Sequence, residues 1–160
     1  MELRLARSDE LDAVGEITLA AYEDFTTGTE DFYRQHLRDA ARRAREAELW
    51  VAVDGDAVLG TVTYCPPGSP WRELGGDDEG EFRMLAVDPA HQKRGAGHAL
   101  VAHCEGRARD HGATGMVLSS LAEMAAAHRV YLRHGYARAP ERDWSPVVGV
   151  HLIAFTKELP

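Results

Sequence analysis

The sequence has few cysteines, and this limits the chemistry that it can support. Cys65 and Cys104 are the only two among 160 residues, and neither belongs to a C-x-x-C pair. The cysteines and histidines also do not cluster with the spacing of a zinc site. We therefore expect no metal and no disulfide framework, and we expect two reduced thiols, as in a cytosolic protein.

Long apolar runs are also missing. No segment approaches the ~20 consecutive apolar residues that a membrane-spanning helix needs. The N-terminal sequence, MELRLARSDELDAVGEI, carries charge where a signal peptide has its apolar run. We therefore expect a cytoplasmic protein without a membrane partner.

Positive charge is in short supply. The chain has 18 Lys and Arg against 26 Asp and Glu, which gives a formal net charge of -8. Nucleic-acid-binding domains are usually basic, so we expect no nucleic-acid partner, and modification of tRNA is disfavoured for the same reason. An acidic surface instead attracts cations such as amines.

The apolar pattern predicts one α/β (α+β) domain with a mixed sheet. Strands are expected at 3–6, 49–53, 58–64, 81–87, 116–120 and 148–155, and helices at 9–22, 30–48, 98–111 and 125–134. An Asp-Gly hairpin turn at 54–57 joins the second and third strands, and a loop rich in Pro and Gly covers 66–80. Hairpins come first and β-α-β crossovers later, so antiparallel and parallel pairs are both expected.

One segment points to an anion site. Residues 92–97, QKRGAG, place two basic side chains and two glycines where a helix begins. Helix N-termini carry unpaired N–H groups, and glycine lets a large anion approach the backbone, so this pattern favours a phosphate or pyrophosphate. The alternative is a helix with a glycine-rich entry and two solvated basic residues. Leu100 stands where a dinucleotide fingerprint has its third glycine, and the P-loop pattern is absent.

The flanking sequences extend this observation. EFRMLAVDPAHQKRGAGHALV (81–101), followed by AAAHRVYLRHGYAR (125–138), resembles the GCN5-related N-acetyltransferase (GNAT) family. The 92–97 segment matches the family's Q/R-x-x-G-x-G/A motif, and Leu85–Pro89 match the strand end before it. Ala127, Tyr131 and Gly135 match the family's later helix, whereas Met124 stands where many members have asparagine.

The resemblance implies a single GNAT-like domain over 1–160, with splayed strands that hold coenzyme A. Members of the family are often homodimers, and the sequence leaves the oligomeric state open. It implies acetyl-CoA as co-substrate and direct attack by a small-molecule primary amine in a ternary complex. The cofactor-binding residues that it implies are Leu85, Ala86, Val87, Gln92, Lys93, Arg94, Gly95, Ala96, Gly97 and His98. A non-catalytic coenzyme A-binding sensor or partner module is the alternative, and a longer acyl donor stays open.

The resemblance also implies two catalytic residues. Tyr131 would protonate the departing thiolate, and Glu81 would remove a proton from the amine, directly or through water. The alternatives are a core tyrosine with a satisfied hydroxyl and a solvated glutamate at a strand end. The resemblance further implies an acceptor pocket from Tyr22, Phe25, Tyr33, Trp71 and Trp144. Asp77, Asp78 and Glu79 lie in a neighbouring loop that would favour a cationic amine, and the alternative is a solvated acidic loop.

Overall fold

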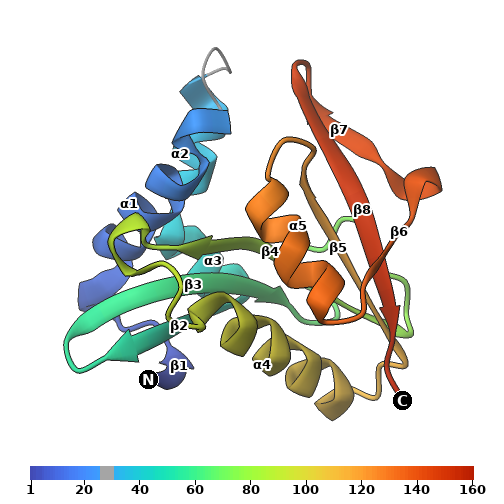
Figure 1. The fold of residues 1–160 in the computed structure, drawn as a ribbon, viewed down its shortest axis with the longest axis horizontal. Coiled ribbons are helices and arrows are strands. Elements are labelled where there is room, and N and C mark those ends of the chain that lie inside the picture. The colour runs from blue at the N-terminus through green and yellow to red at the C-terminus, as the bar shows by residue number, and fades with distance from the viewer. Residues whose placement is uncertain (26–30) are drawn as a thin grey trace.

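The computed structural model of the protein describes residues 1–25 and 31–160, and at residues 31 and 32 only the backbone is described. The strands are β1 (Glu2–Leu5), β2 (Glu48–Asp54), β3 (Ala57–Cys65), β4 (Glu79–Val87), β5 (Gly115–Leu121), β6 (Ala137–Arg138), β7 (Trp144–Val147) and β8 (Val150–Glu158). The α-helices of the described residues are α1 (Leu11–Tyr22), α2 (Asp31–Arg38), α3 (Ala40–Glu46), α4 (Ala96–Asp110) and α5 (Ala125–Arg133). Figure 1 shows their arrangement.

All strands join one sheet with the order β1-β2-β3-β4-β5-β8-β6, and β7 pairs with β8 beside this path. The β4–β5 pair is parallel, and the other described pairs are antiparallel. The prediction of a mixed sheet is therefore confirmed. Since a parallel pair needs a long crossover, α4 connects β4 to β5.

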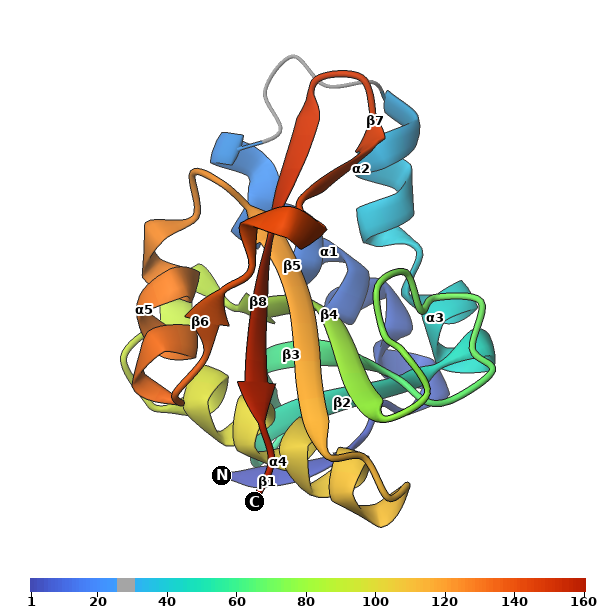
Figure 2. The same cartoon turned by 90° about the vertical axis from the view of Figure 1, so that its right-hand side faces the viewer.

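Helices cover both faces of the sheet (Figures 1 and 2). On one face, α4 and α5 contribute Leu100 and Tyr131 to the largest buried cluster. On the other face, α1 and α2 contribute Tyr22 and Leu37 to a second cluster, and α1 and α3 pack on β2 in a third. Because β4 is covered on both faces, its residues are nearly all buried, polar ones included.

The predicted helix at 30–48 is wrong in its extent. Residue 30 lies outside the described residues, and the rest forms two helices, α2 and α3, with Glu48 already in β2. Asp39 separates the helices, since its carboxylate accepts a hydrogen bond from the Arg42 N–H at 3.1 Å and so caps α3. Side chains that bond to nearby backbone compete with a continuous helix, which explains the break.

The C-terminal region also differs from the expectation of one strand at 148–155. The last strand, β8, runs from Val150 to Glu158, and β7 folds back on it through a turn in which Gly149 has φ +86°. The sequence pattern does not predict β7, because a short strand that contains proline shows no two-residue periodicity, and β6 is only two residues long.

Candidate active site

β4 and β5 part in the middle of the sheet. Their ladder runs from Glu79 opposite Gly115 to Phe82 opposite Leu118, and it ends there. Over residues 83–87, β4 keeps β3 as its neighbour but has no partner on its β5 side within the described chain. Figure 1 shows the two strands diverging. Backbone groups that face such a gap need another partner, which an extended ligand with amide groups can supply.

A β-bulge lies where the strands part. Thr61 pairs with Ala86 and Thr63 pairs with Arg83, so Met84 and Leu85 together oppose one residue of β3. Met84 has φ +54°, which is unusual for a residue with a side chain, and such strain often accompanies functional sites. The bulge places Met84 in the cluster on the α1 side and Leu85 in the cluster on the α4 side.

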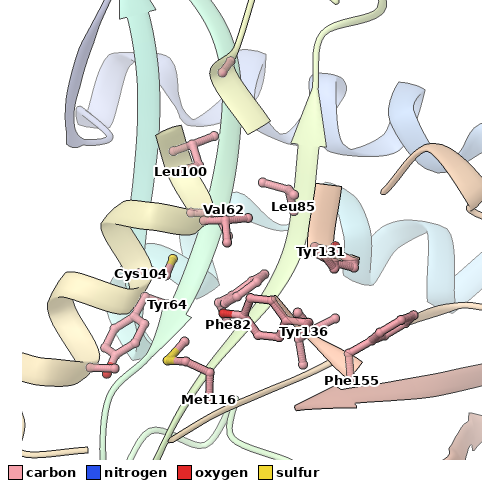
Figure 3. Close-up of a cluster of buried hydrophobic side chains, with 14 of the residues drawn as sticks. Val62, Tyr64, Phe82, Leu85, Leu100, Cys104, Met116, Tyr131, Tyr136 and Phe155 are labelled. Carbon is pink, nitrogen blue, oxygen red and sulfur yellow. The ribbon is translucent and has the colours of Figure 1, made fainter. Parts of the chain in front are cut away.

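Tyr131 lies on α5 beside Leu85 (Figure 3). Its side chain is only 3% exposed and packs against Phe82, Tyr136 and Phe155, with ring centroids 5.7–6.2 Å apart. Burial raises the pKa of Tyr131 above its ordinary value of 10.0, so its hydroxyl keeps its proton at neutral pH. The structure thus places a buried phenol that can donate a proton next to the open edge of β4.

The segment at 92–97 forms a concave backbone turn before α4. Lys93 and Gly95 both have left-handed backbone angles, with φ +65° and +83°, and Gly95 caps the helix without a side-chain hydrogen bond. The first turn of α4 contains no acidic residue, and the helix begins at Ala96, two residues earlier than predicted. Alternating backbone handedness turns successive N–H groups toward one point, which makes a site for an anion.

Three side chains around this turn, those of Arg94, His91 and His98, already have partners in the protein. Arg94 forms an ion pair with Asp54, the last residue of β2, and Nδ1 of His91 lies 2.9 Å from the Asp88 carboxylate. Nδ1 of His98 lies 3.1 Å from Nε2 of His134, the residue that caps the end of α5. The backbone N–H groups of residues 92–97 are therefore the main anion-binding feature of this turn, which we call the cradle.

Glu81 is buried within β4, with 1% of its surface exposed. Its carboxylate accepts hydrogen bonds from the backbone N–H groups of Glu73, Leu74 and Gly75 at 2.7–3.1 Å. These contacts hold the loop between β3 and β4. Glu81 lines neither of the two cavities described next.

Two cavities open on the α1 and α2 side of β4. A cavity of about 20 Å³ lies where β4 and β5 part, and its lining is Tyr22, Tyr33, Arg83, Met84, Ser119, Ser120, Leu121 and Leu152. A wider cavity of about 340 Å³ is lined by Tyr33, His36, Glu73, Arg83, Trp144, Pro146 and Val147. Tyr33 and Arg83 belong to both, so the two cavities adjoin.

The aromatic residues expected at an acceptor pocket are partly brought together. Tyr22, Tyr33 and Trp144 line these cavities, and Trp71 stacks behind the lining residue His36 at 4.6 Å. Phe25 lines neither cavity. The Tyr22 hydroxyl donates a hydrogen bond to the carbonyl of Leu85 at 3.3 Å, which connects the cavity wall to the open strand edge.

Asp77, Asp78 and Glu79 line neither cavity, and Glu79 is already the first residue of β4. Glu79 instead forms an ion pair with Arg142. The sequence reasoning missed His36, Glu73 and Arg83 as lining residues. Burial, with nearby arginines, lowers the pKa of His36 to about 4, so its imidazole is uncharged at neutral pH.

Metal and membrane features are absent from the parts of the chain that the structure describes. Within residues 1–25 and 31–160, no three His, Cys, Asp or Glu side chains gather as a metal site would require. Over the same residues, no helix combines the length and apolar character needed to cross a bilayer.

The sequence profile of the acetyltransferase (GNAT) family matches residues 11–136. The match spans most of the chain, including the parting strands, the cradle and the helix of Tyr131, and the chain belongs to this family. The family resemblance of the sequence is thereby confirmed.

Two curated relatives are similar to the chain. A mycothiol acetyltransferase of Cellulomonas flavigena is 33% identical over 136 residues, which cover 75% of this chain and 39% of that protein. N-acetyltransferase 8B of Rattus norvegicus is 29% identical over 138 residues, which cover 84% of this chain and 58% of that protein. The chain thus spans about two-fifths to three-fifths of the length of these relatives.

A solved structure confirms the fold. The structure of yncA from Salmonella typhimurium, solved with its cofactor acetyl-CoA, has a TM-score of 0.68 and 23% sequence identity to this chain. The similarity covers 100% of this chain and 94% of that one. The arrangement of strands and helices described above is therefore the GNAT fold.

Proposed function

We propose that the protein is an acetyl-CoA-dependent N-acetyltransferase that moves an acetyl group to a primary amine of a small molecule. One observation carries this proposal: the unpaired edge of β4 at Leu85 lies beside the buried hydroxyl-bearing Tyr131. The cradle leads into α4, and one short turn in the chain separates it from the end of β4. Acetyl-CoA has an extended amide-bearing arm and a diphosphate, and these two features need such a pair of sites.

The residues present fit acetyl-CoA. The backbone of Leu85, Ala86 and Val87 offers an open strand edge for the pantetheine amides. The segment at 92–98 offers converging N–H groups and the Lys93 charge for the diphosphate. When bound, acetyl-CoA supplies an activated thioester that an amine can attack.

Tyr131 is the proposed general acid. A phenol with its ordinary pKa of 10.0 is already protonated at neutral pH, and burial raises the pKa of Tyr131 further, so the hydroxyl holds the proton that the leaving sulfur needs. A backbone N–H at the bulge, near Leu85, is the proposed donor to the thioester oxygen.

Glu81 is the proposed base, as the family resemblance implies, and its surroundings set a condition on that role. Backbone N–H groups of the 73–75 loop occupy both carboxylate oxygens. The carboxylate can take a proton only through an oxygen lone pair that these groups leave free or release.

The relatives support a small-molecule acceptor in one respect, since the Cellulomonas relative bears the name of a mycothiol acetyltransferase. The two cysteines are free and buried, which suits the reducing cytoplasm where we propose the protein acts.

The test is release of the coenzyme A thiol from acetyl-CoA in the presence of a panel of primary amines. We expect amine-dependent release together with an N-acetylated product seen by mass spectrometry. Acetyl-CoA binding by calorimetry without turnover of any amine would instead favour the non-catalytic sensor.

A further inference from the structure

Arg83 connects the two cavities on the α1 side of β4. It lines both the small cavity where the strands part and the wider one beyond. The bulge explains this position, because Arg83 and Met84 both face the small cavity although neighbouring residues of a regular strand face opposite sides. The side chain is only 8% exposed, which is unusual for a charged residue.

The partners of Arg83 leave part of its guanidinium free. Nη1 donates to the carbonyl of Trp71 at 3.3 Å and lies 3.6 Å from the Glu73 carboxylate, whose side chain is 38% exposed. Among the residues that the structure describes, Nε and Nη2 have no hydrogen-bond partner. A buried guanidinium is costly unless it is paired, and one weak contact with a half-exposed carboxylate compensates little of that cost.

The guanidinium is held in place by aromatic rings. Its central carbon lies 5.7 Å from the ring centre of Trp71 and 6.0 Å from that of Trp144. The remaining charge on the walls is small, because His36 is neutral at pH 7 and Glu73 is the one acidic residue among those lining the two cavities. Arg83 is thus a fixed cation with donors to spare.

We propose that Arg83 binds a carboxylate of the acceptor, so that the substrates are amino acids or closely similar amines. This inference rests on the proposed acetyltransferase function. A guanidinium offers a planar pair of donors that matches a carboxylate. With the carboxylate on Arg83, an amine one or two carbons away reaches the small cavity where β4 and β5 part, and the amino-acid side chain lies in the cavity of about 340 Å³.

The test compares α-amino acids with the amines left when their carboxylate is removed. Acetyl transfer from acetyl-CoA is measured for aliphatic, aromatic and basic pairs of this kind. We expect kcat/KM to be about ten- to hundredfold higher for the acid of the preferred pair, the size of one charge-assisted contact. Arg83→Gln should bring that ratio close to one, and Arg83→Lys, which keeps the charge but loses the planar fork, should give an intermediate ratio.

Arg42→Gln is the matched control. Arg42 also lies over Trp71, at 5.5 Å, but it lines neither cavity and is paired with Glu46. Arg42→Gln likewise removes one positive charge and one arginine contact with the Trp71 ring, and it should preserve the acid-to-amine ratio of kcat/KM. If the role of Arg83 is purely structural, the acid-to-amine ratio of kcat/KM should stay at the wild-type value in Arg83→Gln as well as in Arg42→Gln.

The outcomes separate this inference from the proposed function. Wild-type transfer to the decarboxylated amines that equals or exceeds transfer to the acids would overturn the carboxylate site, while the acetyltransferase proposal would stand. The wild-type ratio decides this even if the Arg83 variants do not fold. Absence of transfer to any amine would overturn the proposed function. Calorimetry with N-acetyl amino acids on the coenzyme A-loaded protein would then still show whether a carboxylate binds through Arg83, and no binding would overturn both proposals.

Discussion

The substitution Glu81→Gln should destabilise the protein, because it removes the charge that holds the 73–75 loop. Three backbone N–H groups point at the Glu81 carboxylate, and the residue is 1% exposed. A hydrogen bond to a charged acceptor contributes about 1 kcal/mol more than one to a neutral acceptor, so the three N–H groups together correspond to about 3 kcal/mol. For a domain of this length, that loss lowers Tm by about 6–12 °C.

Differential scanning calorimetry measures this effect directly. Glu158→Gln, on the exposed end of β8, is the control, and it should change the unfolding free energy by less than about 0.5 kcal/mol. A Tm of Glu81→Gln within about 2 °C of the wild type would refute the reasoning, since the loop would then be held by something other than this charge.

The pH profile of kcat/KM separates this structural role from the proposed base. If Glu81 takes the proton from the amine, Glu81→Gln should abolish the acidic limb of the profile as well as lowering the rate. If Glu81 only supports the loop, the shape of the profile should persist in the folded fraction of the variant.

Three further predictions concern other parts of the molecule. Tyr131→Phe should lower kcat by about 10²-fold or more while acetyl-CoA affinity by calorimetry stays unchanged; an unaltered kcat would remove its acid role. Gly97→Glu, at the start of α4, should weaken acetyl-CoA binding at least tenfold through repulsion of the diphosphate, whereas Gly106→Glu, in open space on the same helix, should not; equal affinities would argue against the cradle. Arg138 holds the pKa of Asp143 down to about 2, so their pairing stabilises the fold above about pH 4 and is lost as the pH falls toward 2. Asp143→Asn should accordingly lower Tm at pH 6 and have little effect near pH 2; a constant difference across that range would contradict the assignment.

Local sequence was enough to propose where the cofactor binds. The glycines at 95 and 97, with their basic neighbours, indicated an anion cradle, and the left-handed angles at Lys93 and Gly95 now give its geometry. Helix starts and turns depend on residues close together in the chain, so short motifs reveal them. The position of Tyr131 on a helix after the fifth predicted strand was readable for the same reason.

The sequence predicts the residues of the acceptor cavities less completely, because these cavities are assembled from segments that are distant in the chain. His36 comes from α2, Glu73 from the loop before β4, and Trp144 from β7. The acidic loop at 77–79 suggested a cationic acceptor, yet its residues line neither cavity and Glu79 is paired with Arg142. Charge near a site in sequence does not determine which charges face it.

The sequence by itself determined the family, the order of most elements and the glycine-rich helix start that we propose for the diphosphate, because each depends on neighbouring residues. Only the tertiary structure decided which way the side chains of β4 point. Strand alternation would separate Arg83 from Met84, and the bulge opposite β3 turns both toward one cavity. The sequence pattern likewise does not predict that Glu81 is buried against the 73–75 loop. This burial arises from contacts that form only when the sheet is assembled.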